Sequence, residues 1–277
     1  MSDKTLARPA LPLLLRHLKL PSFVEAHAEL SQRAGKEGWT FEGYLHALAE
    51  MEIEDRRVRK IERLRRRSGL PSDKRLSTLE QDRLPVRVTR QLPALCEGGF
   101  VKRAENVLAF GKPGTGKSHV IAAIGHELID RCHAVLYVPT FKLVQQLLLA
   151  KQQLTLEKEL KRLDRFEVVI LDDLGYVQQD REEMEVLFTF LSERYERRSV
   201  MITSNLVFSK WDRIFKDPMT TAAAIDRVVH HSIILEMTGP SFRTEHAKKK
   251  NASASNRPVN TGRTYVDGAG HRLGWAV

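Results

Sequence analysis

The sequence predicts an α/β fold in which a parallel five-stranded sheet is flanked by helices and preceded by a small all-helical N-terminal domain. Short apolar runs alternate with helical segments in residues 104–247, which is typical of a parallel sheet covered by helices. The first of these runs leads directly into a glycine-rich loop and a helix. Residues 1–70 carry apolar positions at spacings of three and four and no strand signal, which predicts the helical domain.

The expected elements follow in chain order. Thr40 is expected to cap a long helix that becomes highly charged and ends near Gly69. Residues 71–103 are expected to form a connector, because three prolines and a glycine pair interrupt the periodicity. Residues 248–277 have no period and are expected to be a disordered basic and polar tail. The predicted strands are Asn106–Phe110, Ala134–Val138, Glu167–Leu171, Val200–Thr203 and Ile233–Glu236.

The length and composition of the chain limit the classes of protein to which it can belong. A chain of 277 residues, 42% of them apolar, can bury the core of one mid-sized domain plus a small appendage. The formal charge of +10 favours a polyanionic partner such as nucleic acid, although solubility alone also accounts for it. Cys96 and Cys132 are expected to be reduced thiols of a cytoplasmic protein. No apolar run reaches the roughly 18 residues that span a membrane, so no membrane partner is expected.

The strongest motif is GKPGTGKS, which has the pattern GxxxxGK[ST] of a phosphate-binding loop. An apolar strand precedes it and a helical stretch from Val120 to Leu128 follows, which is the context that the motif requires. A chance match is therefore disfavoured. His119 directly follows the motif and is expected to be an ordinary helix residue at the end of the nucleotide-binding stretch. The predicted nucleotide-binding residues are Gly111, Lys112, Pro113, Gly114, Thr115, Gly116, Lys117, Ser118 and His119.

Each fixed position of this loop has a physical role. The glycines permit backbone conformations closed to residues with a Cβ atom, so that successive N–H groups point at phosphate oxygens. The helix that follows adds the positive end of its dipole. Lys117 is expected to contact the β- and γ-phosphates, and Ser118 to offer its hydroxyl to Mg²⁺. ATP and Mg²⁺ are therefore the predicted cofactors.

An acidic pair ends the third predicted strand. Asp172 is expected to hold Mg²⁺, mostly through water. Asp173 is expected to orient or deprotonate the water that attacks the γ-phosphate. Two carboxylates that merely end a strand at the surface are the alternative, and the phosphate loop earlier in the chain favours the functional interpretation.

Three later positions are candidates for contact with the γ-phosphate. Asn205 or Thr203, at the end of the fourth predicted strand, is expected to hydrogen-bond the phosphate or the attacking water, and a simple turn is the alternative. Arg227 is expected to reach the nucleotide of a neighbouring subunit, unless it only forms part of a charged pair on a solvated helix face. Arg243 is expected either to contact phosphate within its own subunit or to anchor the last strand.

Several motifs together resemble one family. The phosphate loop, VVILDDLGY at Val168–Tyr176, TSNLVFSKWDRIF at Thr203–Phe215 and AAAIDRVVHHS at Ala222–Ser232 are similar to motifs of the IstB-like ATP-binding proteins. These are helper ATPases encoded beside the transposase of certain bacterial insertion sequences. LKLPSFVEA at Leu18–Ala26 and the basic stretch Ala49–Pro71 resemble the N-terminal region of the same family. The resemblance covers nearly the whole chain except the tail.

This resemblance implies an AAA+ core of the P-loop NTPase class, ATP-dependent self-assembly on double-stranded DNA, and delivery of that DNA to a transposase. The same core resembles helicase loaders of the DnaC type and, more remotely, the replication initiator DnaA. The sequence departs from the common pattern at Lys112, Ser118 and Asp173, where Pro, Thr and Glu are frequent. Asp173 is one methylene shorter than glutamate, so slow hydrolysis is expected without a partner. No separate helical lid domain is evident after residue 236.

A basic helix is the main candidate for DNA contact. Residues 56–67 contain eight Lys or Arg and one acid, Glu62. In a helix, Val58, Ile61 and Leu64 share one side, and the basic groups on the rest are expected to lie along phosphates without reading the base sequence. A solvated helix with an apolar seam for another subunit is the alternative. Weaker candidates are Lys248–Lys250 and the basic residues Lys151, Lys158, Lys161 and Arg162.

Together these features predict an ATP-dependent helper of transposition that is a homo-oligomeric ATPase. It is expected to assemble on double-stranded DNA without sequence preference, to hydrolyse ATP, and to recruit a DDE transposase. A replicative helicase loader is one alternative. A DNA-binding adaptor that binds ATP without hydrolysing it is the other.

Overall fold

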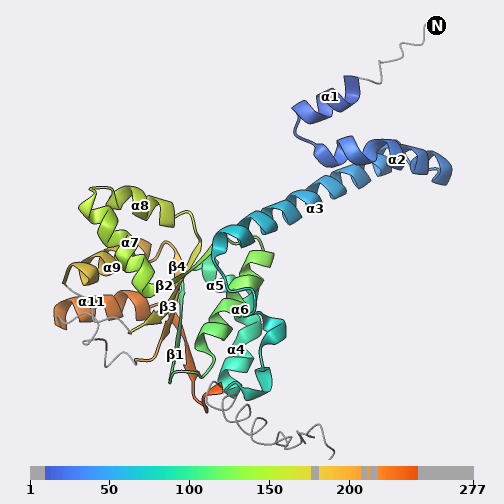
Figure 1. Cartoon of the computed structure of the whole chain (residues 1–277). Helices are drawn as coiled ribbons and strands as arrows, with labels where there is room; N and C mark the ends of the chain where they lie inside the picture. Colours follow the sequence, from blue (N-terminus) through green and yellow to red (C-terminus); the bar gives the residue numbers. More distant parts are fainter. Residues whose placement is uncertain (1–9, 176–180, 207–210, 212–217, 243–277) are drawn as a thin grey trace, which may run out of the picture.

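In the computed structural model, which describes residues 10–175, 181–206, 211 and 218–242, a five-stranded parallel sheet forms the centre of the molecule. The strands lie in the order β2-β3-β4-β1-β5 (Figure 1). This confirms the predicted fold class, and each predicted strand begins within one residue of the observed one. The strands are β1 Asn106–Gly111, β2 Val135–Pro139, β3 Val168–Leu174, β4 Ser199–Ser204 and β5 Ser232–Met237.

Helices cover both faces of the sheet (Figure 1). Strand β1 is buried on both sides: Leu108 and Phe110 belong to one core cluster, and Val107 and Ala109 to the other. This explains why the strands are continuously apolar rather than alternating. The first cluster is covered by α7 Thr140–Gln152, α8 Leu156–Leu163, α9 Arg181–Arg194 and α11 Pro218–Val229, and the second by α4 Val86–Glu97, α5 Gly99–Lys102 and α6 Lys117–Asp130.

The N-terminal helices form an arm that projects from this core (Figure 1). Its helices are α1 Ala10–His17, α2 Pro21–Glu37 and α3 Phe41–Ser68. Thr40 caps α3 by accepting a hydrogen bond from Gly43 N at 3.0 Å, and Gly69, in the left-handed conformation at φ 67°, ends it.

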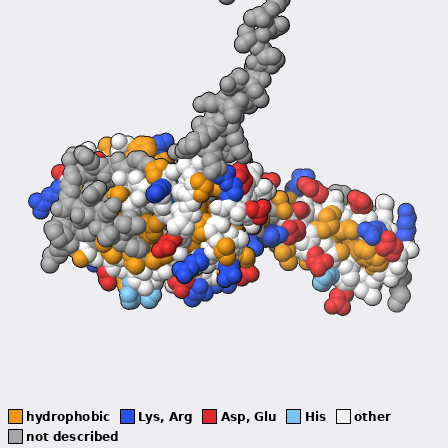
Figure 2. Space-filling model, turned by 90° about the horizontal axis from the view of Figure 1, so that it is seen from below, with side chains coloured by type: hydrophobic (Ala, Val, Ile, Leu, Met, Phe, Trp, Pro, Cys, Tyr) orange, Lys and Arg blue, Asp and Glu red, His pale blue; other side chains and the backbone are white. Residues whose placement is uncertain are grey.

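The end of α3 anchors the arm on the core. Ile61 and Leu64 pack against the cluster around α6, and Arg65 pairs with Asp130 at 2.5 Å. The rest of the arm keeps several large apolar side chains exposed, including Phe41, which is 95% exposed. Figure 2 shows these hydrophobic surfaces on the projecting lobe, interspersed with charged side chains.

The segment 71–103, expected as a connector, contains more structure than the sequence indicated. It holds the short 3₁₀ helices η1 Leu76–Thr78 and η2 Gln81–Arg83 and the helices α4 and α5. Val88, Leu92 and Leu95 of α4 are buried in the core beside α6. Their spacing is helical, but Pro93 within the same stretch masks the signal because proline usually interrupts a helix.

Several expectations fall outside the described residues: Arg243, the run Lys248–Lys250 and the tail 248–277. Within the part of the chain that is described, no helix is both long and apolar enough to cross a membrane.

Candidate nucleotide-binding site

The predicted phosphate loop connects the end of β1 to the start of α6. Gly114 and Gly116 have φ values of 82° and 91°, which residues with a Cβ atom rarely adopt. A Cβ atom at Gly114 would also overlap with the side chain of Ser241. Lys117 lies over the loop, and its Nζ donates to the carbonyl oxygens of Gly111 at 2.8 Å and Lys112 at 2.9 Å. The loop is therefore a tight backbone cradle that depends on glycine at two positions.

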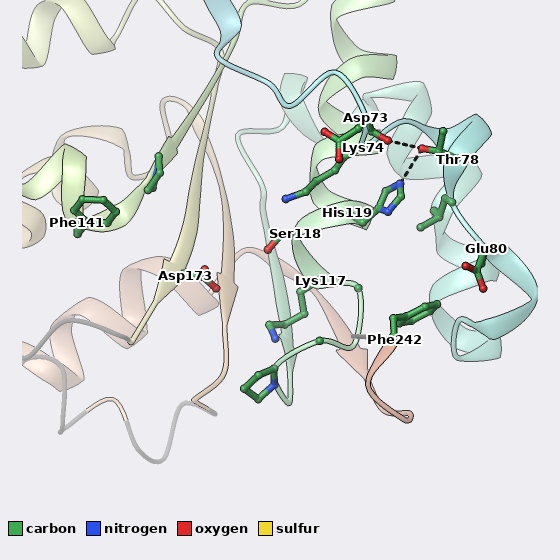
Figure 3. Close-up of a pocket in the computed structure, with 15 residues that line it drawn as sticks. Asp73, Lys74, Thr78, Glu80, Lys117, Ser118, His119, Phe141, Asp173 and Phe242 are labelled. Carbon is green, nitrogen blue, oxygen red and sulfur yellow. Dashed lines mark hydrogen bonds between the residues drawn. The ribbon is translucent and has the colours of Figure 1, made fainter. Parts of the chain in front are cut away.

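A cavity of about 790 Å³ opens beside this loop. Figure 3 shows Lys117 and Ser118 on one side of it, Asp173 on the other, and Lys74 reaching toward the same space from the connector. Parallel strands end at one edge of the sheet, which is how residues far apart in sequence meet here. Seven of the predicted residues line the cavity: Pro113, Gly114, Gly116, Lys117, Ser118, His119 and Asp173.

Asp172 does not line the cavity and is only 8% exposed. Its Oδ1 accepts a hydrogen bond from Thr203 Oγ1 at 2.6 Å, and its Oδ2 accepts a short one from the Tyr137 hydroxyl. Burial, together with the bond to Asp172, raises the pKa of Tyr137, so its hydroxyl stays protonated and can donate. The neighbouring Asp173 is exposed at the cavity wall. The two carboxylates thus have different environments.

Thr203 and Asn205, the two candidates for contact with phosphate, differ in their hydrogen bonding. Thr203 is fully buried, and its hydroxyl bonds to both members of the acidic pair. It donates to Asp172 Oδ1 and accepts from Asp173 N at 2.8 Å. Asn205 Oδ1 is buried with no hydrogen-bond partner among the described residues. Strand β4 lies between β3 and β1, so Asn205 follows the strand that separates the acidic pair from the phosphate loop. Neither residue lines the cavity; Asn205 differs from Thr203 in having a side-chain oxygen with no partner among the described residues.

Arg227 does not line the cavity of its own subunit. It lies on α11 with its guanidinium carbon 4.7 Å from the ring centroid of Phe188 on α9. Its Nη1 is buried and has no hydrogen-bond partner in the described part of the chain. Arg227 thus lies apart from the nucleotide cavity that the described residues form.

The connector, residues 71–103, forms a wall of the cavity, and the sequence did not predict this. The connector carries no phosphate-binding motif, and only the fold brings the connector to the phosphate loop. His119 is more than an ordinary helix residue, because its Nε2 lies 3.1 Å from Thr78 Oγ1 and 3.2 Å from the carbonyl oxygen of Arg75 (Figure 3). His126 Nε2 likewise lies 2.9 Å from the carbonyl oxygen of Pro71. The connector residues in the wall are Asp73, Lys74, Thr78, Leu79 and Glu80.

A second unpredicted contact closes the cavity near the loop. Phe242, beyond the end of β5, lines the cavity, and its backbone N–H donates to the carbonyl oxygen of Gly114 at 2.9 Å. The guanidinium of Arg83 stacks on the Phe242 ring at 3.9 Å. The segment after the last strand and the connector therefore meet above the phosphate loop.

The fold and this loop define a P-loop ATP-binding protein of the AAA+ type. The family model of the IstB-like ATP-binding proteins matches residues 13–251, and the chain belongs to that family. The insertion-sequence ATP-binding protein y4iQ/y4nD/y4sD of Sinorhizobium fredii is 42% identical over 244 residues, which cover 88% of this chain and 82% of that protein. The insertion sequence IS21 ATP-binding protein of Pseudomonas aeruginosa is 34% identical over 249 residues, 89% of this chain and 93% of that protein.

Solved structures share the fold at lower identity. A crystal structure of DnaI has 22% identity and a TM-score of 0.50, covering 62% of this chain and 96% of that one. AMPPCP-bound DnaA from Aquifex aeolicus has 18% identity and a TM-score of 0.51, covering 68% of this chain and 57% of that one. These similarities support the AAA+ architecture.

Proposed function

We propose that this protein is the DNA-binding ATPase that assists the transposase of its insertion sequence. ATP would bind at the phosphate loop and promote assembly of subunits on double-stranded DNA. Hydrolysis would release the assembly, and the assembled complex would recruit a DDE transposase. The observation that carries the ATPase part is the shared cavity, where Lys117 and Ser118 of the loop face Asp173 of the acidic pair.

The residues at this cavity divide the chemistry of phosphoryl transfer among them. The loop backbone and Lys117 would hold the β- and γ-phosphates. Asp173, exposed at the cavity wall, would orient the attacking water and accept its proton. Asn205, whose Oδ1 is without a partner among the described residues, would hydrogen-bond that water or the γ-phosphate.

The oxygen donors at this edge of the sheet suit Mg²⁺, which prefers hydroxyl, carboxylate and water ligands. Ser118 would hold the ion directly. Asp172 would hold it through water, since both of its carboxylate oxygens already accept hydrogen bonds from the protein. When bound, the ion neutralises charge on the phosphates.

The basic face of α3 is the proposed DNA contact. Lys60, Arg63 and Arg67 are exposed and have no acidic side chain within ion-pair distance among the described residues. Their spacing of three and four places them on one side of the helix. The alternative surface on α7 and α8 is largely neutralised, because Lys151, Lys161 and Arg162 pair with Glu185, Glu157 and Glu159.

Two substitutions test the ATPase assignment. Lys117→Ala is expected to abolish nucleotide binding, since it removes the cation over the loop. Asp173→Asn is expected to retain binding and stop turnover, because the amide cannot accept the proton from water. Nucleotide binding measured by calorimetry and phosphate release measured with and without duplex DNA distinguish the two effects. Normal ATP binding by Lys117→Ala would show the loop assignment to be wrong.

The same measurements separate the alternative functions. Phosphate release stimulated by duplex DNA supports the ATPase. ATP binding without release, with or without DNA and transposase, indicates an adaptor that uses ATP as a structural ligand. Capture of a replicative helicase instead of the adjacent transposase in a pull-down indicates a helicase loader.

A further inference from the structure

We propose that Thr203 is a positioning residue that sets the orientation of both carboxylates at the end of β3, with Tyr137 holding the second oxygen of the metal-binding one. This inference rests on the proposed ATPase function and deepens it. The two residues lie on the strands that flank β3, Tyr137 on β2 and Thr203 on β4. Asp172 is thus held from both sides by hydroxyl groups.

The hydrogen bonds define the arrangement. Thr203 Oγ1 donates to Asp172 Oδ1 at 2.6 Å, and Tyr137 donates to Oδ2. All three groups are buried or half-buried, and charge-assisted bonds of this kind are stronger there than in water. With both oxygens bonded, the carboxylate cannot rotate freely. Its remaining lone pairs are therefore held in fixed directions.

The same Thr203 hydroxyl also fixes the backbone of Asp173. It accepts a hydrogen bond from Asp173 N at 2.8 Å, and Asp173 has the left-handed φ of 61°. The pairing of β3 with β4 shifts register between Leu171 and Leu174, so β3 carries an extra residue here. A bulge of this type redirects a side chain that a regular strand would point elsewhere. Asp173 accordingly lines the cavity, although it is adjacent to the buried Asp172.

This geometry brings the carboxylate of Asp173 to the cavity wall. The structure therefore assigns to Thr203 a different task from that of Asn205. A hydroxyl has one proton, and the proton of Thr203 is already donated to Asp172. It is not available for the γ-phosphate.

The test compares three hydroxyl deletions in the full-length protein. Thr203→Val removes the positioning hydroxyl with little change in shape, and Thr203→Ser restores it. Tyr137→Phe removes only the second donor to Asp172. Thr140→Val is the matched control, because Thr140 is equally buried and its hydroxyl donates to the backbone carbonyl oxygen of Asp172 at 2.9 Å, not to the carboxylate.

Two quantities are measured for each variant. One is the affinity for a fluorescent ATP analogue, in EDTA and across a Mg²⁺ titration. The other is the steady-state kcat and KM of phosphate release. Thermal denaturation confirms that each variant is folded.

For Thr203→Val we expect kcat to fall at least tenfold and the Mg²⁺ concentration for half-maximal binding to rise severalfold, with unchanged affinity in EDTA. Thr203→Ser is expected to recover most of both values. Tyr137→Phe is expected to shift the Mg²⁺ titration with a smaller loss of kcat, since it leaves Asp173 in place. Thr140→Val is expected to match the wild type in both.

Failure of this inference differs from failure of the ATPase assignment. A folded Thr203→Val variant with wild-type kcat and Mg²⁺ dependence would overturn the positioning role while leaving the ATPase intact. Equal losses in Thr203→Val and Thr140→Val would also overturn it, since the effect would then be general. A wild-type protein that binds no nucleotide would refute the proposed function itself.

Discussion

At the scale of single residues, a buried arginine holds the sheet to the helices on one face. Arg194 on α9 is 2% exposed, and its guanidinium donates to the carbonyl oxygens of Leu163, Phe166, Glu167 and Ser199 at 3.0–3.2 Å. Burial lowers the pKa of Arg194 to about 9, so the group is still charged at neutral pH. It ties together the loop before β3 and the start of β4.

Arg194→Met is therefore expected to cost roughly 3–5 kcal/mol of unfolding free energy, because it removes four hydrogen bonds made by a buried charged donor. Chemical denaturation of Arg194→Met and of a control variant, Arg197→Met, measures the loss of unfolding free energy. Arg197→Met is the control: Arg197 is 58% exposed and forms surface ion pairs, so a loss below about 1 kcal/mol is expected. Equal losses in the two variants would contradict the structural role of Arg194.

At the scale of elements, the hairpin of α2 and α3 depends on one buried carboxylate. Glu52 is 4% exposed and accepts hydrogen bonds from Ser22 N at 2.9 Å and from Arg56 Nε at 2.6 Å. Burial opposes ionisation of Glu52, but the bonds from Arg56 and Ser22 outweigh it and lower the pKa. A lowered pKa stabilises the fold at pH values above the ordinary glutamate range, and this stabilisation is lost as the pH falls through the folded-state pKa.

We therefore expect Glu52→Gln to reduce the protection of the α2 amides from hydrogen exchange at neutral pH. We also expect the protection in this variant to change less than in the wild type when the pH is lowered. In the wild type, the same amides should lose protection as the pH falls below the ordinary glutamate range. Glu54→Gln is a matched control on the same helix, since Glu54 is 58% exposed and, within the described part of the chain, pairs with Arg57 alone. Protection of α2 that is equal in the wild type and Glu52→Gln would contradict the role of this carboxylate.

The basic face of α3 gives a second prediction at this scale. Replacing Lys60, Arg63 and Arg67 with glutamine is expected to weaken duplex binding for all sequences alike. The slope of log affinity against log salt should fall by about 3, since each lost phosphate contact contributes about 0.9. Fluorescence anisotropy at several salt concentrations measures the duplex affinity and the slope of log affinity against log salt. A matched triple replacement of Lys151, Lys161 and Arg162, which are already paired with acids, should leave the slope nearly unchanged.

Elements with a strong local signal can be predicted from the sequence, and elements whose formation depends on distant parts of the chain cannot. The strands and the helix after the phosphate loop follow from continuous apolar runs and a fixed motif. The helix α4 was hidden by Pro93, and the wall formed by Asp73 and Lys74 follows only from how the chain folds back. The bonds of Tyr137 and Thr203 to Asp172 likewise depend on strand order, which the sequence alone does not specify.

At the scale of the whole molecule, the expected contact of Arg227 with the nucleotide of a neighbouring subunit implies a site shared between subunits. If it reaches a neighbour's nucleotide, Arg227→Ala should bind ATP normally but hydrolyse it slowly. Mixing Arg227→Ala with Lys117→Ala should then restore part of the phosphate release, since an intact loop and an intact arginine can meet in mixed assemblies. Release from the mixture that equals the sum of the two separate variants would argue against the shared site.

The route of the chain through the connector has a mechanical consequence. The stretch that leaves α3 at Gly69 forms one wall of the cavity before the chain enters α4. Residues 41–60 of α3 extend about 30 Å beyond the point where Ile61 and Leu64 rest on the core. A tilt of about 10° at that pivot would swing the far tip by about 5 Å, since a stiff rod magnifies a small turn at its base. A ligand in the cavity would therefore contact the chain segment that directly continues the arm, and the exposed apolar surface lies at the far end of that arm.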